Sequence, residues 1–405
     1  MRNADFRRFW GSTILTSFGG QITLLALPLC AVLLLHASAG QMGLLTALET
    51  VPFLIFSLPT GVLLDRARRL PVMMASDAML ATALASVPIA WWLGMLTMHW
   101  LYAVGFIIGI GAVIGGSAEQ IFLTFLVGRD GLVQARAKFG TTDSASRLVG
   151  PGIAGVLVQL LGAPFAVLFN VSAFIVSLWN LTRIHAKEPA PVFADEHPVR
   201  AIALGLRFIW DHPLLRMLAW TAGTWHFLFG AYMALQVLFA TRVLGMTPGM
   251  LGAAQMLGGF GMLAGSLAMT PLSKRYGSGA TILIGLCSTV VAFALVPTIP
   301  PALFGSAAAT VFAYGVVVFF LDLGALLFFM PYISLRQRVT PDALLGRMTS
   351  TMRFVTAASA PFGALLAGAI GEQYGVRVAL GGVAVGGVIL AVAMVCGTRL
   401  RHVKD

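Results

Sequence analysis

The chain has 405 residues, of which 58% are apolar and only 10% are charged, and its formal net charge is +11. A water-soluble globule of this length needs far more polar residues to cover its surface, so the composition excludes a soluble protein and indicates a membrane protein. The mean hydropathy of +0.90 agrees with this reading.

Long apolar segments predict helices that cross the membrane, because about 20 apolar residues in a helix span about 30 Å of hydrocarbon. Dividing the chain at its proline, glycine and charge clusters gives twelve spans. The apolar runs are too long and continuous for the short alternating strands of a membrane barrel. We therefore predict an all-α integral membrane protein. Its spans are residues 9–35, 40–64, 71–94, 99–127, 140–162, 164–184, 214–241, 248–272, 279–299, 302–333, 346–370 and 375–398.

Basic residues gather on one side of this predicted topology. When both termini lie on one side, about 22 of the 26 Lys and Arg residues fall on that side. Both termini should therefore be cytoplasmic, in a multi-pass protein of the cytoplasmic (inner) membrane. Attraction to anionic headgroups and this topological bias explain the positive charge, so we expect membrane lipids and no nucleic acid as partners. The basic N-terminus runs directly into an apolar span without a cleavage site, which indicates a membrane helix and not a signal peptide.

A polar stretch, residues 185–213, divides the spans into two sets of six. We expect an N-terminal six-helix bundle in residues 1–184 and a C-terminal one in residues 214–405. The second part of the linker, from Arg200 on, places apolar residues on one helical face and basic residues on another. It is therefore predicted to be an amphipathic helix along the cytoplasmic interface.

The two halves resemble each other at a shift of about 209 to 210 residues. The corresponding positions are Arg7 and Arg216, Gly43 and Gly252, Asp65-Arg66 and Lys274-Arg275, and Pro151 and Pro361. Two parallel six-helix repeats are the architecture of the major facilitator transporters, in which the substrate binds near the membrane midplane between the halves. The sequence thus predicts two pseudo-symmetric bundles.

Several motifs carry a more specific resemblance. GVLLDRARR, residues 61–69, resembles the loop signature of the major facilitator superfamily, although Arg68 stands where that family usually has glycine. RLVGPGIAG, residues 147–155, is similar to the Gly-Pro motif of the antiporter branch. Residues 205–216 and 334–350 resemble the subgroup of enterobactin exporters and macrolide efflux pumps. The resemblance covers essentially the whole chain and implies a monomeric, proton-driven exporter.

The charged loop predicts a contact that closes the cytoplasmic side. Asp65 can accept hydrogen bonds from the free amides at the start of the eleventh span, where a helix N-terminus favours an anion. Arg66 and Arg69 can pair with acids at nearby helix ends, such as Asp77. Alternatively, these residues only set the topology.

Gly150 and Pro151 lie in the middle of the fifth span, where the proline removes a backbone hydrogen bond. Together with Gly155 they allow a facing helix to approach closely. The resemblance implies that this region seals the interface between the halves. A kinked, tightly packed helix is the alternative.

Charged residues inside spans are candidates for function, because each costs about 2.5 to 3.5 kcal/mol at the helix centre. Glu119 and Arg147 lie about 12 Å deep on successive spans. We expect them to form an ion pair, which Asp143, one turn from Arg147, can share. The pair is either structural or broken by a proton during transport.

Three further charges complete this set. Arg353 lies at a similar depth on the eleventh span, and we expect it to approach Glu49 of the second. Asp322 has apolar neighbours on every face of the tenth span, and desolvation favours the neutral form of such a carboxyl. We therefore predict that Asp322, Glu119 or Glu49 carries the coupled proton. A neutral Asp322 bonded to a backbone carbonyl is the alternative.

Polar and aromatic residues on the first and seventh spans are candidates to line the substrate cavity. They are Gln21, Trp225, His226 and Tyr232. Packing or lipid-facing positions are equally compatible with the sequence.

The sequence does not contain the motifs of ATP-driven pumps or of common enzyme classes. No Gly-Lys-Ser/Thr phosphate loop exists, which disfavours an ATP-driven pump. No Ser/His/Asp set or metal-spaced cluster is present, and the three cysteines lie in separate spans, so we predict no enzyme, no cofactor and no metal. The predicted function is proton-coupled efflux, by alternating access, of a small amphipathic molecule such as a drug-like compound or a siderophore. Proton-coupled uptake of a small metabolite is the alternative, and a membrane enzyme is a remote one.

Overall fold

The computed structural model describes residues 4–186, 188 and 198–397, although the side chains of 58, 62, 65, 129, 130, 198–203, 342, 343 and 346 are not described. Every regular element in these ranges is a helix. The first helices in chain order are α1 (Ala4–Leu29), η1 (Cys30–Leu34), α2 (Ala39–Arg66), α3 (Arg69–Trp92), α4 (Met98–Leu161) and α5 (Ala163–Thr182). After these come α6 (Pro198–Asp211), α7 (Pro213–Leu238), η2 (Phe239–Val243), α8 (Pro248–Tyr276), α9 (Ser278–Leu295), η3 (Val296–Thr298), η4 (Leu303–Gly305), α10 (Ala307–Arg338), α11 (Asp342–Ala357), α12 (Ala360–Tyr374) and α13 (Val376–Gly397).

Twelve helical segments in the described part of the chain are long and apolar enough to cross a membrane, which confirms the predicted fold class. The fourth and fifth predicted spans are joined in α4, which bends at Gly128. The backbone there has φ 67° and ψ 177°, a conformation open to glycine but not to other residues. The eleventh predicted span is formed by α11 and α12 together.

The chain forms two compact units. The first comprises Met1–Ala37 and Leu48–Asp195, and the second comprises Ser38–Ala47 and Glu196–Asp405. The first turns of α2 therefore group with the second unit, although the rest of α2 belongs to the first. The sequence analysis did not anticipate this assignment, because nothing local distinguishes these turns from the remainder of the helix.

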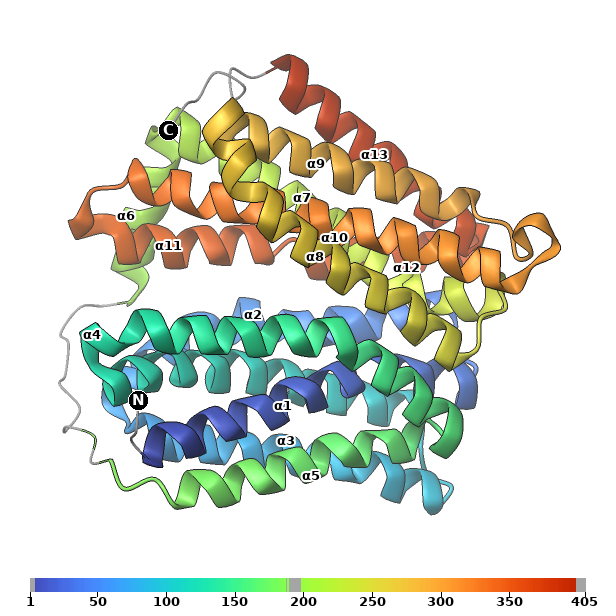
Figure 1. Ribbon diagram of the computed structural model, residues 1–405, viewed down its shortest axis with the longest axis horizontal. Coiled ribbons are helices and arrows are strands. Elements are labelled where there is room, and N and C mark those ends of the chain that lie inside the picture. The colour runs from blue at the N-terminus through green and yellow to red at the C-terminus, as the bar shows by residue number, and fades with distance from the viewer. Residues whose placement is uncertain (1–3, 187, 189–197, 398–405) are drawn as a thin grey trace. The chain divides into compact units, whose positions relative to one another are not determined.

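In the first unit, α1 and α3 each pack against both α4 and α5 (Figure 1). Asn170 of α5 lies against Gly19 of α1, where a side chain would collide with it, and donates a hydrogen bond to Thr23 at 2.7 Å. Near the start of α1, the rings of Phe9 and Phe122 lie 5.1 Å apart, edge to face. These contacts fix the mutual rotation of the helices that carry the polar residues described below.

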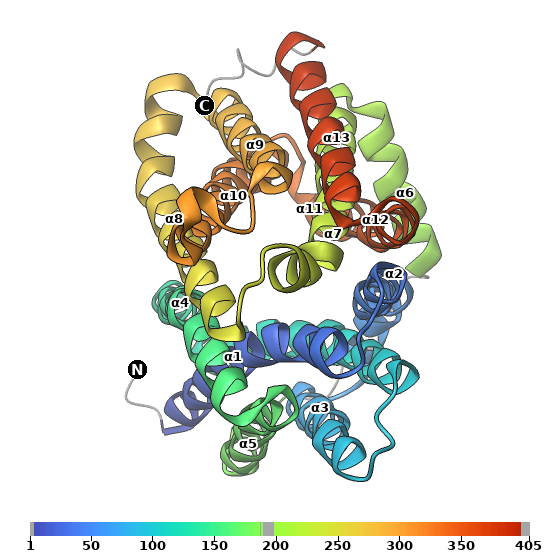
Figure 2. The same ribbon diagram turned by 90° about the vertical axis from the view of Figure 1, so that its right-hand side faces the viewer.

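In the second unit, α10 lies between α8 and α9, and Figure 2 shows the three helices side by side. Small residues permit this close packing. A Cβ at Gly285 of α9 would lie 2.5 Å from the amide nitrogen of Phe328 and 2.7 Å from the carbonyl oxygen of Gly324. On α8, a side chain at Gly261 would collide with the carbonyl group of Phe319. Interfaces of this kind replace the hydrophobic effect as the source of helix association in lipid.

Both units contain the same backbone irregularity. The π-helical segments η1 and η2, at Cys30–Leu34 and Phe239–Val243, are separated by about 209 residues, the shift of the internal repeat. Each is followed by a residue with positive φ, His36 at 51° and Gly245 at 69°. Matching irregularities at one shift support two repeats of a common six-helix unit.

The start of α2 is held against α12 within the second unit. The amide of Gly40 donates to Oε2 of Glu372 at 2.9 Å, so this carboxylate caps the N-terminus of α2. A Cβ at Gly43 would lie 2.6 Å from the carbonyl oxygen of Ala364 and 2.9 Å from Cα of Gly368. Gly43, which the sequence singled out only as a repeat marker, is therefore required for backbone approach.

Arg377 fixes the loop between α9 and α10. Its guanidinium donates to the carbonyl oxygens of Pro297 and Ile299, both at 2.9 Å. We expect Arg377→Met to lower the free energy of unfolding by about 1 to 3 kcal/mol, since two charge-assisted hydrogen bonds are lost. Hydrogen exchange should show faster exchange in residues 296–306. Arg275→Met is the control, because Arg275 is exposed and its guanidinium lies over the Tyr276 ring, and equal exchange in both variants would contradict the assignment.

Candidate functional site

A polar cavity of about 220 Å³ lies in the first unit, among α1, α3, α4 and α5. Two acids line it, Asp77 of α3 and Glu119 of α4. The hydroxyl-bearing residues of its lining are Ser12, Thr13, Thr16, Ser76 and Ser177. Apolar residues complete the wall, among them Phe9.

Each acid is held by one hydroxyl group from another helix. Thr13 Oγ1 donates to Glu119 Oε1 at 2.9 Å, and Ser177 Oγ donates to Asp77 Oδ2 at 2.7 Å. The two carboxyl groups are close enough to interact electrostatically. Among the described residues that line the cavity, none is a Lys, Arg or His. The site therefore brings two acids together without a cation.

Small residues make room for this cavity between α3 and α4. Ser76 Oγ donates to the carbonyl oxygen of Gly111 at 3.2 Å, and a Cβ at Gly115 would lie 2.8 Å from the same hydroxyl oxygen. Asp77 follows Ser76 directly, so the close contact of the two helices fixes the position of its side chain. Gly111 and Gly115 have no functional side chain, but by allowing this close contact they fix the position of the Asp77 carboxyl group.

The predicted ion pair between Glu119 and Arg147 is not formed. Within the described residues Arg147 pairs with Asp143, with Nε 3.0 Å from Oδ2, and both side chains are about half exposed. Glu119 instead points into the cavity toward Thr13. The direction of each side chain depends on helix rotation and on the bend at Gly128, which sequence proximity does not reveal. Asp143 therefore pairs with Arg147 directly and does not share it with Glu119.

Asp77 does not pair with the loop bases either. Arg69 lies at the first position of α3, two turns before Asp77, and its guanidinium is 3.8 Å from Glu188. Both Glu188 oxygens accept backbone hydrogen bonds, from the amides of Arg69 at 2.7 Å and Leu70 at 2.6 Å. The Glu188 side chain is only 3% exposed. A residue of the predicted linker therefore caps the N-terminus of α3, where an anion is favoured.

We expect Glu188→Gln to loosen the first turn of α3, because an amide offers one acceptor oxygen and no charge to the two backbone donors. The free energy of local opening should fall by about 1 kcal/mol, the usual effect of losing a helix cap. Hydrogen exchange at Arg69 and Leu70 measures it. Asp211→Asn is the control, since Asp211 belongs to an exposed pair with Arg207 at 3.8 Å. If the amides of Arg69 and Leu70 exchange at the same rate in the two variants, Glu188 is not the cap.

The remaining predicted gating and coupling residues lie as follows. The side chain of Asp65 lies outside the described residues, so its predicted contact with the eleventh span stays a prediction. Arg66 is the last residue of α2 and is exposed. Glu49 lies on α2 beside α4, where a side chain at Gly109 would collide with the Glu49 carbonyl. Arg353 is exposed on α11, and its proximity to Glu49 stays a prediction.

The Gly-Pro motif lies where α4 crosses α1. A Cβ at Gly150 would lie 2.6 Å from Cβ of Gln21. Gln21 therefore covers the glycine that the motif supplies, and Pro151 and Gly155 are buried on the same helix. Close packing within the first unit is observed directly. The role in sealing the two halves stays a prediction.

Trp225 and Tyr232 lie inside the second unit, at 4% and 1% exposure. The Trp225 ring stacks on Phe229 with centroids 4.7 Å apart, and the Tyr232 hydroxyl lies 3.1 Å from that of Tyr314. Both side chains are buried and make ring or hydroxyl contacts within the second unit, and their role in lining the substrate cavity stays a prediction. His226 Nδ1 lies 2.7 Å from the carbonyl oxygen of Ala222.

Asp322 lies on α10 where this helix meets α8. A side chain at Gly258 would collide with its carboxylate, and Val318 lies on the same face. Asp322 also interacts electrostatically with Tyr232. The acid that the sequence singled out therefore lies near the Tyr232–Tyr314 hydroxyl pair and is half-buried.

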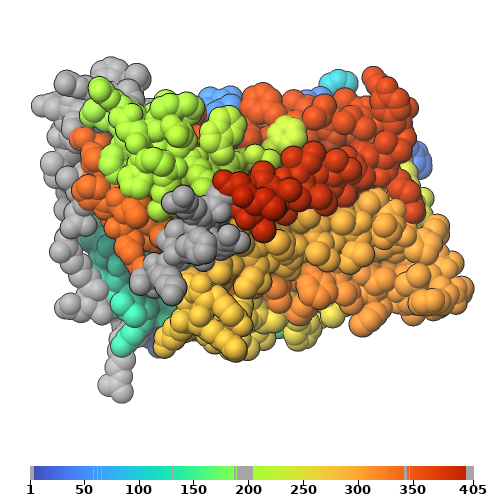
Figure 3. Space-filling model, turned by 90° about the horizontal axis from the view of Figure 1, so that it is seen from above, coloured from blue at the N-terminus to red at the C-terminus, as the bar shows by residue number. Residues whose placement is uncertain are grey.

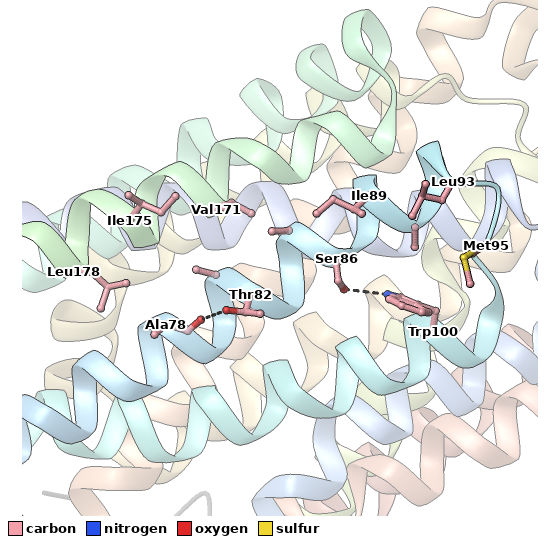
Figure 4. A pocket seen from close by; sticks show the side chains of 13 residues that line it. Ala78, Thr82, Ser86, Ile89, Leu93, Met95, Trp100, Val171, Ile175 and Leu178 are labelled. Atoms are coloured by element: carbon pink, nitrogen blue, oxygen red, sulfur yellow. Dashed lines mark hydrogen bonds between the residues drawn. The ribbon is translucent and has the colours of Figure 1, made fainter.

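A second hollow of the first unit has a different character. A groove of about 540 Å³ runs between α3 and α5, and Figure 4 shows Ile89, Ile175 and Leu178 lining it. Its polar features are small, such as the hydrogen bond from Trp100 Nε1 to Ser86 Oγ at 3.0 Å. Its described lining residues include no acid and no base, in contrast to the polar cavity.

The geometry can now be compared with known proteins. The model of the transmembrane secretion effector family matches residues 1–405. The chain belongs to this family. The multidrug efflux pump Tap of Mycolicibacterium fortuitum is 27% identical over 398 residues, which cover 95% of this chain and 93% of Tap. The enterobactin exporter EntS of Citrobacter koseri is 24% identical over 350 residues, covering 86% of this chain and 80% of EntS.

Solved structures confirm the fold. The nucleoside transporter NupG superposes with a TM-score of 0.76 at 12% identity, covering 98% of this chain and 99% of NupG. A bacterial homologue of the iron transporter ferroportin gives 0.72 at 16% identity, covering 97% of this chain and 98% of that protein. The predicted major facilitator fold and the predicted resemblance to efflux transporters of this superfamily are therefore confirmed, as is the multi-pass membrane character.

Sequence reasoning missed the hydroxyl partners of the acids and the cap of α3. Thr13 and Ser177 are ordinary residues of apolar helices, and only their meeting with Glu119 and Asp77 distinguishes them. A usable signal was the cluster of Ser12, Thr13 and Thr16 within one apolar span. Glu188 had no comparable signal.

Proposed function

We propose that this protein is a proton-coupled exporter of a small amphipathic molecule, working by alternating access as a monomer in the cytoplasmic membrane with both termini in the cytoplasm. The observation that carries the coupling is the pair of acids, Asp77 and Glu119, in one cavity without a basic residue in its described lining. Efflux is supported by family membership and by the relatives Tap and EntS.

The chemistry follows from the absence of a neutralising partner in that lining. An unpaired charge inside a membrane protein is unfavourable, and two like charges in one cavity are more so. A proton held by either carboxyl group removes one charge, while Thr13 and Ser177 continue to hold the side chains. Taking up or releasing that proton therefore changes the relative free energy of conformations in which the cavity is dry or open to water. Such differential stabilisation is what couples an ion to a conformational change.

Asp322 is proposed as the titratable group of the second unit. It lies near the buried hydroxyl pair of Tyr232 and Tyr314, which can relay a proton or orient the carboxyl group. Because the carboxyl group of Asp322 lies beside Gly258, its protonation changes the charge at the contact between α8 and α10. Each unit thus has its own acid within the span region.

The cargo is proposed to be drug-like or siderophore-like, because Tap is named as a multidrug efflux pump and EntS as an enterobactin exporter. Proton-coupled uptake uses the same fold and acids, and only the direction of transport distinguishes it. Accumulation of dyes, macrolides and catecholates in cells with and without the protein decides between them. An exporter lowers accumulation, whereas a symporter raises it.

Coupling is tested with purified protein in liposomes carrying an imposed pH gradient. We expect the cargo found in the cellular screen to move against its own gradient when the compartment receiving it is acidic, as proton–cargo exchange requires. Transport only down the cargo gradient, with no response to pH, would exclude proton coupling while leaving a facilitated transporter.

A further inference from the structure

We infer that the second unit contains a binding site for an anionic phospholipid, in an apolar groove between α6, α7 and α11 with Arg216 at its mouth. The groove has a volume of about 390 Å³. Its lining residues include Ile209 and Trp210 of α6, Phe227 of α7 and Val355 of α11. Figure 3 looks onto the face of this unit where α6 lies, in yellow-green.

Glycine leaves the interior of the groove open. A Cβ at Gly223 of α7 would meet no atom within 4 Å, although this residue lies on a helix between packed neighbours. Near Phe227, α7 packs closely on α12, because side chains at Gly230 and Gly363 would collide with the backbone of Ala360 and Phe227. From Arg216 to Phe227 the groove extends about 16 Å along α7, the length of a hydrocarbon chain segment and not of a compact solute.

The mouth carries the only formal charge among the described lining residues, the guanidinium of Arg216. Its Nη1 donates to the carbonyl oxygen of Trp210 at 3.4 Å, and its Cζ lies 5.9 Å from the Trp210 ring. No carboxylate pairs with it in the described part of the chain, so most of its five donors are available. A phosphate group suits these donors.

The surroundings point to a lipid rather than to transported cargo. Trp210 and Trp220 are 56% and 66% exposed at the groove, as expected of aromatic residues at a membrane interface. The amphipathic helix α6 forms one wall, and it is predicted to lie along the interface on the side where the basic residues gather. Basic pockets between membrane helices on that side bind anionic headgroups. A phospholipid can place an acyl chain against the apolar lining of the groove and its phosphate group against the Arg216 guanidinium.

The bound lipid would hold the linker helix against the second unit. At present α6 contacts α11 through Gly205, where a side chain would collide with Thr351, and it contacts α7 near Arg216. A lipid chain between these helices adds apolar contacts to all three walls. Anionic lipid should therefore raise the thermal stability of the protein.

Two variants remove different parts of the site. Gly223→Leu fills the interior without touching Arg216, and Arg216→Gln removes the charge without filling the interior. Their controls are Gly381→Leu, at another helical glycine with no atom within 4 Å of its Cβ, and Arg207→Gln, on the exposed face of α6. Native mass spectrometry of each protein with phosphatidylglycerol or phosphatidylcholine gives the affinity, and thermal unfolding gives the stabilisation.

We expect phosphatidylglycerol to bind at least about tenfold more weakly to both site variants, a loss of 1.4 kcal/mol, and normally to both controls. Its stabilising effect should disappear in the same two variants. Equal binding of phosphatidylglycerol and phosphatidylcholine, or full binding by Gly223→Leu, would overturn the inference and leave ordinary annular lipid. Displacement of the lipid by the transported compound would also overturn it and assign the groove to cargo. The test requires no transport, so its outcome is independent of the proposed coupling.

Discussion

Glu119→Gln is expected to reduce export driven by a pH gradient by at least about tenfold, equivalent to 1.4 kcal/mol or more in the rate-determining step. Glutamine keeps an acceptor for Thr13 Oγ1, which now bonds the carboxylate at 2.9 Å, so the packing of α1 on α4 should survive. What is lost is the group that takes up and releases the proton. Asp77→Asn should have the same consequence, because Asp77 lies in the same cavity and its bond from Ser177 is likewise retained by the amide oxygen.

The double variant should be little worse than either single variant, because the two carboxyl groups act on one shared proton and their effects cannot add. Exchange of labelled cargo across liposomes without a pH gradient separates coupling from folding, and we expect this exchange to persist in all three variants. Asp211→Asn is the control, since this acid forms an exposed pair with Arg207 and does not line the cavity. Full pH-driven export by Glu119→Gln and Asp77→Asn would contradict the assignment of coupling to this cavity.

Gly285→Leu is expected to have the largest effect on stability, lowering the free energy of unfolding of the second unit by about 3 kcal/mol or more. The new Cβ would lie 2.5 Å from the backbone nitrogen of Phe328 and 2.7 Å from the carbonyl oxygen of Gly324. Both atoms belong to the main chain of α10, so no side-chain rotation relieves the contact. The two helices must separate, which also disturbs the segment of α10 that carries Asp322.

Thermal unfolding in detergent, followed by tryptophan fluorescence, measures this effect. Gly381→Leu is the control, because a side chain at this α13 position meets no atom within 4 Å. Equal melting temperatures for the two variants would contradict a close backbone contact between α9 and α10 at Gly285. Gly285→Ala should lie between the wild type and the leucine variant.

The candidate site could be predicted from the sequence only in part. Glu119 stands out because acids are rare in apolar helices, and that rule needs no tertiary information, whereas Asp77 was predicted only as a partner of the loop bases. Their partners could not be inferred in the same way. Thr13 lies 106 residues before Glu119, and Ser177 lies 100 residues after Asp77. Sequence proximity instead suggested Arg147, which the structure places outside the cavity with Asp143.

The role of a linker residue was also not predictable from the sequence. Its polar composition predicted residues 185–213 as a linker, but one of its acids, Glu188, is buried as the cap of α3. A helix N-terminus attracts any carboxylate within reach, and the reach of a loop is set by the packing of the helices on either side. Likewise, Gly223 looks like any other helical glycine in the sequence, and only its surroundings show that it opens a groove.

The sequence alone determined that this is a twelve-span membrane protein with a repeated six-helix unit, and its motifs carried the resemblance to the family. These properties depend on composition, segment length and local pattern, which each stretch of chain has independently of the rest. Tertiary structure decided which side chains meet: the two acids with their hydroxyl partners, Glu188 with α3, and Arg216 at the mouth of a groove. Such meetings depend on helix rotation, on bends such as that at Gly128, and on close contacts between distant segments, none of which a local pattern contains.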